Sequence, residues 1–487
     1  MKKIQKFTTC IAALAIAAPL AVADAKTYVI NNSNSDKLGS SEVLGDLPSA
    51  LVTKNNSILG DYKKSKDIHQ IDKNFDIPKV SKDKITQSKA QIPNLVEDYQ
   101  VGDTRDFTTI NMVTNADEKT KATLQYDGSK AQIWVADSRV TKEKAEQIGK
   151  EFDQNIGPVV EKYFSTPSDI DKNGKINILV FDIKDDFEKT GSYVGGYFHP
   201  RDLLMMNGSN MSETFYMDTF PSMGKNGEMD VTKIYTTLAH EYQHMVNFNR
   251  NILVEKGDFI DGKMDTWLNE AFSMASEQIY SKQPLTKRIE YFNKSESIAN
   301  GHSLIKWQNN NDVLSNYSLS YLFGQYLRTQ ADNGDAIFKE ILEDQGTTIE
   351  TLQNAIHKHV SPTMSVDQFM TNFRVALVKK DKSGPYGFKG EAGFDQINPI
   401  HITNLPESLM PQGAVVFDAK DDFKVPSNKG QHIQYVDISG AASEEPTGET
   451  PTGEEPTAEE PTGETPTAET PEPCPNGDLW CPGNYPR

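Results

Sequence analysis

Residues 237–248 read Thr237-Leu238-Ala239-His240-Glu241-Tyr242-Gln243-His244-Met245-Val246-Asn247-Phe248, and their spacing is the most informative in the chain. Apolar residues recur in and before this segment at helical intervals, namely at Ile234, Leu238, Met245 and Phe248. The pattern predicts a helix on which His240 and His244 lie one turn apart and can bind one cation. Neutral imidazoles suit zinc, and Glu241 beside them can accept a proton from water that the metal has acidified. The motif therefore predicts a hydrolytic zinc site, against the alternative of ordinary surface or core histidines.

A hydrolytic zinc site needs a third protein ligand, because the fourth position is left for water. The long motif with a third histidine is excluded, since Asn247 and Arg250 stand where it requires Gly and His. A second helix is predicted from Asp265, a suitable N-cap, and Glu270 lies early in it among apolar neighbours. A carboxylate has little reason to lie there without a cation, so we expect Glu270 to be the third ligand. Glu277, two turns later, is the alternative ligand, and a solvated helical Glu without metal is the third interpretation.

A second segment, 169–175, also has the pattern of a metal site and reads Asp-Ile-Asp-Lys-Asn-Gly-Lys. It matches the first half of a helix-flanked calcium loop, with oxygen side chains at Asp169, Asp171 and Asn173 and Gly at the sixth position. The twelfth position is Val180, so the usual bidentate Glu is missing and a strand begins where the second helix should. A calcium-stabilised turn and an acidic turn without metal both stay open.

The order of the expected elements indicates the fold class. Runs typical of strands come first, at 108–113, 131–135, 176–181, 203–206 and 214–217. A helix is expected over 141–163, and nearly every periodic segment from 231 to 378 has helical spacing. Strands followed by helices predict an α+β domain, in which a mixed sheet precedes a helical subdomain, rather than a doubly wound α/β fold.

The 487 residues exceed what one hydrophobic core usually supports, so several segments are expected. They are a signal peptide (1–24), a pro-segment or N-terminal linker (25–94), a small β unit (95–140), the catalytic domain (141–395), a small C-terminal β unit (396–440), a Pro/Thr/Glu repeat linker (441–473) and a Cys-containing segment (474–487). The first segment has early lysines and an apolar run too short to span a membrane comfortably. We therefore expect a secreted, extracellular protein made as a zymogen, with no membrane segment after signal removal.

Cysteine usage agrees with export. Cys10 would leave with the signal peptide, and only Cys474 and Cys481 remain, in a turn-rich segment that a disulfide can close. A two-cysteine metal site is the alternative, although it would lack two of the four usual ligands.

The net charge of −19 argues against a nucleic-acid partner. No Gly-x-Ser-x-Gly elbow is present and no cysteine survives in the main domain, so a serine or cysteine nucleophile is not expected. We expect a monomer whose partners are protein or peptide substrates.

With these motifs, the chain resembles the gluzincins, zinc peptidases whose third ligand is the Glu of an Asn-Glu dipeptide on a following helix. Within them it is most similar to the hyicolysin family of secreted bacterial neutral metallopeptidases, over roughly residues 95–395. The resemblance depends on three segments, 239–244 (Ala-His-Glu-Tyr-Gln-His), 267–271 (Trp-Leu-Asn-Glu-Ala) and 316–323 (Asn-Tyr-Ser-Leu-Ser-Tyr-Leu-Phe). It implies a zincin-like fold and endopeptidase cleavage of proteins. It also implies His240, His244 and Glu270 as zinc ligands and Glu241 as the general base.

The resemblance further implies a donor for the oxyanion of the tetrahedral intermediate, a Tyr or His on a helix after the Glu ligand. Tyr317 is the candidate and Tyr321, one turn later, is the alternative. Both can equally be core aromatics, because Leu319, Leu322 and Phe323 make this helix well buried.

One position departs from the family pattern, and two other functions share the same residues. Ser273 is followed by Met274, where thermolysin-like members have an Asp that orients the first zinc histidine, so the partner of His240 is unassigned. A metallo-exopeptidase such as an aminopeptidase would differ only in how it holds substrate termini. A non-catalytic surface-binding module would keep zinc for structure alone.

Overall fold

The structure is a computed structural model of the 487-residue chain. It describes residues 26–32, 40–53, 69–71, 73, 75, 98–224, 229–254, 264–307, 312–344, 346–420 and 422–439. The expected signal peptide (1–24), the repeat linker (441–473) and the segment with Cys474 and Cys481 lie outside the described residues.

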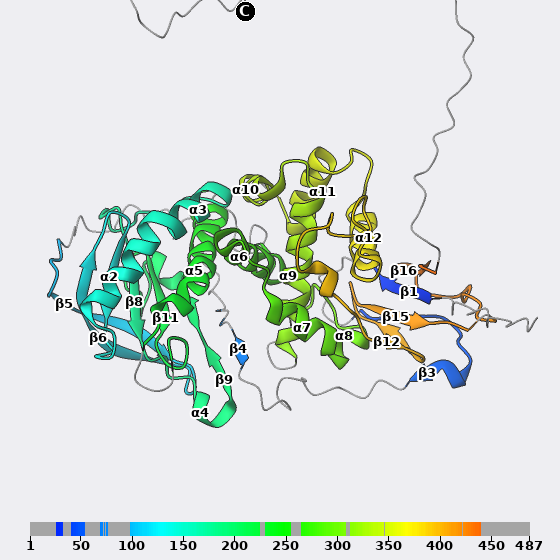
Figure 1. The fold of residues 1–487 in the computed structure, drawn as a ribbon, viewed down its shortest axis with the longest axis horizontal. Helices are drawn as coiled ribbons and strands as arrows, with labels where there is room; N and C mark the ends of the chain where they lie inside the picture. Colours follow the sequence, from blue (N-terminus) through cyan, green and yellow to red (C-terminus); the bar gives the residue numbers. More distant parts are fainter. Residues whose placement is uncertain are drawn as a thin grey trace, which may run out of the picture. The chain divides into compact units, whose positions relative to one another are not determined.

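A six-stranded mixed sheet forms the first half of the fold (Figure 1). In spatial order its strands are β10 (Gly196–Phe198), β11 (Thr214–Asp218), β8 (Ile176–Phe181), β7 (Ala131–Val135), β6 (Ala116–Asp127) and β5 (Thr104–Asn111). β7, β8 and β11 are parallel, whereas β5, β6 and β10 pair antiparallel with their neighbours. All six residues of β8 are buried, as a strand covered on both faces requires. The boundary expected near residue 140 lies between two strands of this one sheet.

Helices that follow β7 cover one face of the sheet (Figure 1). They are α2 (Lys142–Glu151), the π-helical turn η3 (Phe152–Ile156) and α3 (Gly157–Tyr163), and together they occupy the residues expected as one helix. The Thr141 hydroxyl begins the run by accepting the Lys144 amide, as an N-cap does. The other face of the sheet buries a second core cluster that includes Trp134, Leu179 and Tyr216.

The second half of the fold is helical. Its helices are α5 (Tyr235–Phe248), α6 (Thr266–Ser281), α7 (Thr286–Lys294), α8 (Glu296–Ala299), α9 (Val313–Gln330), α10 (Ile337–Glu343), α11 (Thr348–His359) and α12 (Val366–Lys379). α5 packs against both α6 and the sheet, and α6 packs against α9. Gly324 on α9 permits the close packing of α6 and α9, because a Cβ there would lie 2.8 Å from the carbonyl oxygen of Ala271 on α6. A mixed sheet followed by a helical region confirms the expected α+β class.

A separate four-stranded sheet joins the two ends of the described chain. Its order is β12 (His401–Ile402), β15 (Ala414–Asp418), β1 (Lys26–Asn31) and β16 (Ile433–Asp437). β1 pairs antiparallel with both β15 and β16. Two short ladders lie beside it, β13 (Leu405–Pro406) with β3 (Val52–Thr53) and β14 (Ser408–Leu409) with β2 (Glu42–Val43). Part of the segment expected as a pro-segment is therefore built into the C-terminal β unit.

Shorter elements complete the fold. They are β4 (His69–Ile71), β9 (Ser192–Val194), α4 (Phe187–Thr190), η1 (Ser49–Leu51), η4 (Pro200–Leu203), η5 (Val231–Ile234), η6 (Asn249–Val254), η7 (Gly334–Ala336) and η8 (Phe394–Gln396). The strand expected at 203–206 is absent, because Pro200 and the His199 side chain, which accepts the Arg201 amide, start η4 instead. Among the described helices, none has the length and apolarity needed to cross a membrane.

Candidate metal centre

The predicted metal ligands meet between α5 and α6. His240 and His244 lie one turn apart on α5 and are 5 % and 8 % exposed, and Glu270 on α6 is fully buried. The Nε2 atom of His240 lies 3.4 Å from Glu270 Oε2, and that of His244 lies 3.7 Å from Glu270 Oε1. The three side chains therefore direct two imidazole nitrogens and one carboxylate toward one point.

These distances fit a tetrahedral zinc ion. Ligand atoms about 2.1 Å from a tetrahedral metal lie about 3.4 Å from one another. Two neutral imidazoles and one carboxylate are also the donor set of a hydrolytic zinc site that keeps one position for water. The residues thus fit the metal in both spacing and chemistry.

The outer nitrogens of both imidazoles have partners of their own. His240 Nδ1 lies 2.8 Å from Glu277 Oε1, and His244 Nδ1 lies 3.0 Å from the Ser273 hydroxyl. A carboxylate can only accept, so the Glu277 contact places a proton on His240 Nδ1 and leaves Nε2 for a metal. Glu277, considered from sequence as an alternative ligand, contacts His240 and takes the place of the orienting carboxylate that the sequence left unassigned.

Glu241 lies on α5 next to the edge of the six-stranded sheet. It is buried, and a Cβ added to Gly196 on β10 would lie 3.0 Å from its Cγ. The same Cβ would lie 2.9 Å from the Tyr216 carbonyl oxygen. Only a residue without a side chain lets this edge strand pass so close to Glu241.

The two tyrosines considered for the oxyanion have different surroundings on α9. The Tyr321 hydroxyl donates to Gln278 Oε1 at 2.5 Å and accepts the Leu285 amide at 2.9 Å. Tyr317 is fully buried, with the Arg288 guanidinium 4.6 Å above its ring and Trp307 edge-on at 5.0 Å. Burial raises the pKa of Tyr193, on β9, to about 12, and the charge of Arg288 offsets part of this rise. Arg288 is therefore close to both Tyr317 and Tyr193.

A strand from the N-terminal segment lies beside this edge. β4 pairs in parallel with β9, and the Gln70 side-chain amide donates to the Thr237 hydroxyl on α5 at 3.2 Å. His69 packs edge-on against Tyr291 of α7, with ring centroids 6.3 Å apart. Phe75 stacks on His199, 4.2 Å between centroids. This segment thus contacts the sheet, the helix with the two histidines and the helical half.

The second predicted metal segment also has a carboxylate cluster. Asp169 and Asp171 lie together with Glu213, their ligand atoms all within 4.8 Å of one another. Asn173, the third residue expected there, accepts the Lys175 amide at 2.6 Å and donates to Asp171 at 3.0 Å. Glu213 was missed from sequence, since it lies far along the chain and outside any calcium-loop spacing.

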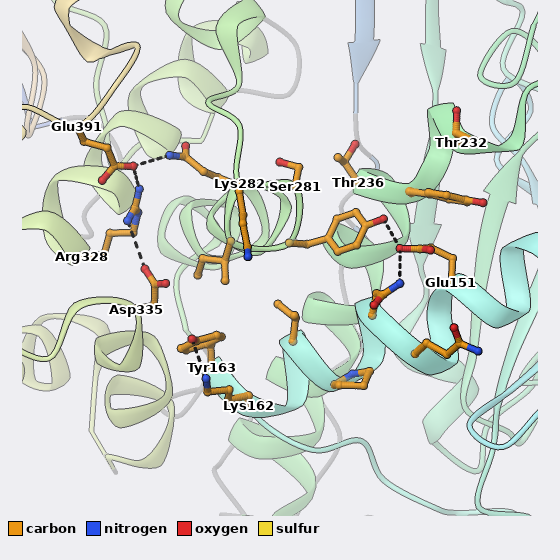
Figure 2. A pocket seen from close by; sticks show the side chains of 18 residues that line it. Glu151, Lys162, Tyr163, Thr232, Thr236, Ser281, Lys282, Arg328, Asp335 and Glu391 are labelled. Carbon is orange, nitrogen blue, oxygen red and sulfur yellow. Dashed lines mark hydrogen bonds and ion pairs between the residues drawn. The ribbon is translucent and has the colours of Figure 1, made fainter.

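A cavity of about 1010 Å³ lies elsewhere, between α3, the start of α5 and the ends of α6 and α9 (Figure 2). Arg328 at its wall pairs with Asp335 and Glu391, and Tyr280 donates to Glu151. None of the four residues expected at the metal centre lines this cavity. The cavity is therefore separate from the metal centre.

Comparison with known proteins agrees with this geometry. The profile of the Peptidase M30 family matches residues 103–421. The chain is also 52 % identical over 417 residues to the neutral metalloprotease ShpI of Staphylococcus hyicus, a match that covers 85 % of this chain and 94 % of that protein. The resemblance to the hyicolysin family is thereby confirmed. The chain belongs to the Peptidase M30 family and is a metalloprotease, a hydrolase that acts on protein substrates.

Proposed function

We propose that the protein is a secreted zinc endopeptidase in which His240, His244 and Glu270 hold the metal and Glu241 is the general base. One observation carries this proposal. The Nε2 atoms of the two histidines lie 3.4 and 3.7 Å from the two oxygens of one buried carboxylate. Such an arrangement of two imidazoles and an acid is expensive to bury unless a cation completes it.

Zinc, when bound there, would lower the pKa of water and polarise the substrate carbonyl. Glu241 would take the proton of the attacking water and pass it to the leaving amine nitrogen. Glu277 would hold the His240 ring in the required tautomer, and Ser273 would position the His244 ring.

Tyr317 is our proposal for the oxyanion donor. Its rival Tyr321 already uses its hydroxyl for Gln278 and Leu285, which ties it to the end of α6. The Arg288 guanidinium over the Tyr317 ring places a positive charge next to this tyrosine, which would favour an oxyanion bound there.

The N-terminal segment is proposed to include an inhibitory strand, within the pro-segment expected at 25–94. What supports this is the contact of Gln70 with Thr237, one helical turn before Glu241, and the pairing of β4 with β9. A peptide substrate that pairs with β9 would have to displace β4. The unprocessed chain should then cleave a blocked peptide far more slowly than the processed one, and equal rates would contradict the proposal.

The main test compares secreted wild type with Glu241→Gln for cleavage of casein and of a peptide blocked at both ends. Wild type should cleave both substrates, since an endopeptidase needs no free terminus, and each protein should hold one zinc. Glu241→Gln should lose about a thousandfold or more of turnover, because proton transfer is lost while the ligands survive. Zinc without cleavage in processed wild type, or cleavage of free-ended peptides alone, would contradict the endopeptidase proposal.

A further inference from the structure

The turn at Asp169–Gly174 meets Glu213 because of how two strands pair. β8 begins just after this turn, and β11 begins just after Glu213. The two strands lie side by side in parallel, with Thr214 opposite Asn177 (Figure 1). Parallel strands start at the same edge of a sheet, and the Asn177 amide donates to the Glu213 carbonyl oxygen at 2.7 Å. A carboxylate from a distant part of the chain is thereby placed next to the acidic turn.

Backbone amides of the turn hold the side-chain oxygens of both aspartates. The Gly174 amide donates to Asp169 Oδ1 at 3.0 Å, and the Asn173 amide donates to Asp171 Oδ1 at 3.2 Å. Gly174 has a φ of 68° and Lys172 a φ of 61°, the left-handed backbone that a tight turn of this kind requires. These bonds hold the two aspartates near each other and near Glu213.

Glu213 is the observation that points to a ligand. Its side chain is fully buried, and Oε1 accepts the Ile170 amide at 2.8 Å. Its other oxygen, Oε2, is buried and has no hydrogen-bond partner among the described residues. Burial raises the pKa of Glu213 to about 7, with the nearby Ser168 hydroxyl offsetting part of the rise. A buried carboxylate that lies this close to two other carboxylates is stable only when it is protonated or has a cation beside it.

Two basic side chains of the neighbourhood are engaged elsewhere. Lys175 pairs with Asp127 at 2.5 Å, and Arg105 donates to the Asn210 carbonyl oxygen at 2.7 Å and to the Ser212 hydroxyl at 3.1 Å. Neither of them forms an ion pair with the cluster among the described residues, and burial raises the pKa of Asp171, a rise that the charge of Arg105 offsets only in part.

We propose that Asp169, Asp171 and Glu213 form a calcium site, separate from the catalytic metal centre. All three ligands are hard oxygen donors, which calcium accepts in sets of six to eight together with carbonyls and water. Glu213 replaces the distal acid that a calcium loop takes from its twelfth position, where this chain has Val180. Bound calcium would fasten the turn before β8 to the start of β11, and so stabilise the sheet whose edge strand lies against Glu241.

The test measures thermal unfolding of the processed, zinc-loaded protein with and without added Ca²⁺. At a Ca²⁺ concentration near a hundred times the dissociation constant, we expect the Tm of wild type to rise by about 5 °C. Glu213→Gln should show no such rise, and calorimetric titration should find one calcium fewer than in wild type. Glu188→Gln, an exposed acid on α4, is the matched control and should keep the full shift.

Zinc content is measured in every sample, so that loss of the catalytic metal is not mistaken for loss of calcium. If Glu213→Gln does not fold, Asp169→Asn replaces it, because Asp169 is exposed and its change should weaken calcium binding about tenfold or more without removing the fold. A wild type with no calcium shift would overturn the proposal. So would an equal shift in wild type and Glu213→Gln, or an equal response to Mg²⁺, which demands smaller octahedral sites.

Discussion

Two clusters of side chains with the chemistry of metal ligands lie on different elements of this protein, and they differ in donor type and in burial. The first has two imidazoles and one carboxylate, all buried, on the helices α5 and α6. The second has three carboxylates and no imidazole, and its members range from exposed to fully buried. They lie on a turn and just before a strand. Softer nitrogen donors favour zinc, whereas oxygen donors alone favour calcium.

The clusters also differ in the groups around them. Both histidines of the first cluster have a side-chain partner on Nδ1, while Nε2 lies near Glu270. In the second cluster, backbone amides of the turn hold the carboxylates. The first arrangement sets the direction of each ligand, as catalysis requires, and the second ties backbone segments together. Chemistry and stability are therefore expected to depend on separate metals.

The largest effects should come from two matched substitutions, one in each cluster. Glu270→Gln should lose zinc, by about a hundredfold or more in affinity, and with it nearly all peptidase activity, but keep the calcium-induced rise in Tm. Glu213→Gln should keep zinc and activity at low temperature and lose the calcium response. Metal analysis, casein cleavage and unfolding curves on the same samples measure both. If either variant loses both metals, the two clusters are not independent.

The second prediction tests whether Glu277 orients the His240 ring. Glu277→Gln should lower zinc affinity about tenfold, and Glu277→Ala about a hundredfold, because His240 loses a charged acceptor and then any acceptor. Competition with a zinc chelator measures this. Glu290→Gln, an exposed residue on α7, is the control. Unchanged affinity in Glu277→Ala would show that the bond to His240 has no orienting role.

A smaller effect concerns the strand against Glu241. Gly196→Ala should reduce kcat by about tenfold or more while zinc stays bound, since the new Cβ would press on Glu241 and on the Tyr216 carbonyl. Gly346→Ala is the control, because its Cβ would meet only the Glu350 and Thr351 side chains, the nearest at 3.2 Å. Normal kcat in Gly196→Ala would mean that β10 and Glu241 can separate freely.

The smallest effect concerns His199, which lies in neither cluster and makes the free energy of unfolding depend on pH. Burial, and then the charge of Arg201, lower the pKa of His199 to about 3. The unfolded chain binds a proton there near pH 6.5, so the stabilisation is complete above that pH and is lost as the pH falls toward 3. The loss should be about 1 kcal/mol per pH unit. His199→Asn should flatten this slope in urea unfolding between pH 7 and 5, and an unchanged slope would assign the acid instability to other groups.

The first cluster could be predicted from sequence because its spacing is local. A helix places His240 and His244 together by its period, and the apolar surroundings of Glu270 point to a cation. The contact of Glu277 with His240 was not predicted, since it depends on how α6 is rotated against α5. Glu213 could not be found either, because only the parallel pairing of β8 and β11 brings it to the turn.

In the fold, too, elements with a local sequence signal were predictable and long-range pairings were not. The buried run of β8 and the helical spacing of 141–163 are local signals, and both elements formed where they were expected. The pairing of β1 with β15 and β16 connects distant residues and has no local signature. The prediction of a strand at 203–206 was wrong. It relied on the apolar composition of these residues and gave too little weight to Pro200, which starts η4.

The position of β1 also constrains when the molecule can finish folding. A ribosome makes β1 before every other described element, yet β15 and β16, its two neighbours, are among the last. The C-terminal sheet cannot close until synthesis has reached β16, and such long-range closure is slow. During that delay β1 has two unpaired edges, which in strands invite pairing with other chains. A chain that stops before β15 would keep those edges permanently, so truncation should affect solubility even though every residue of the metal centre is present.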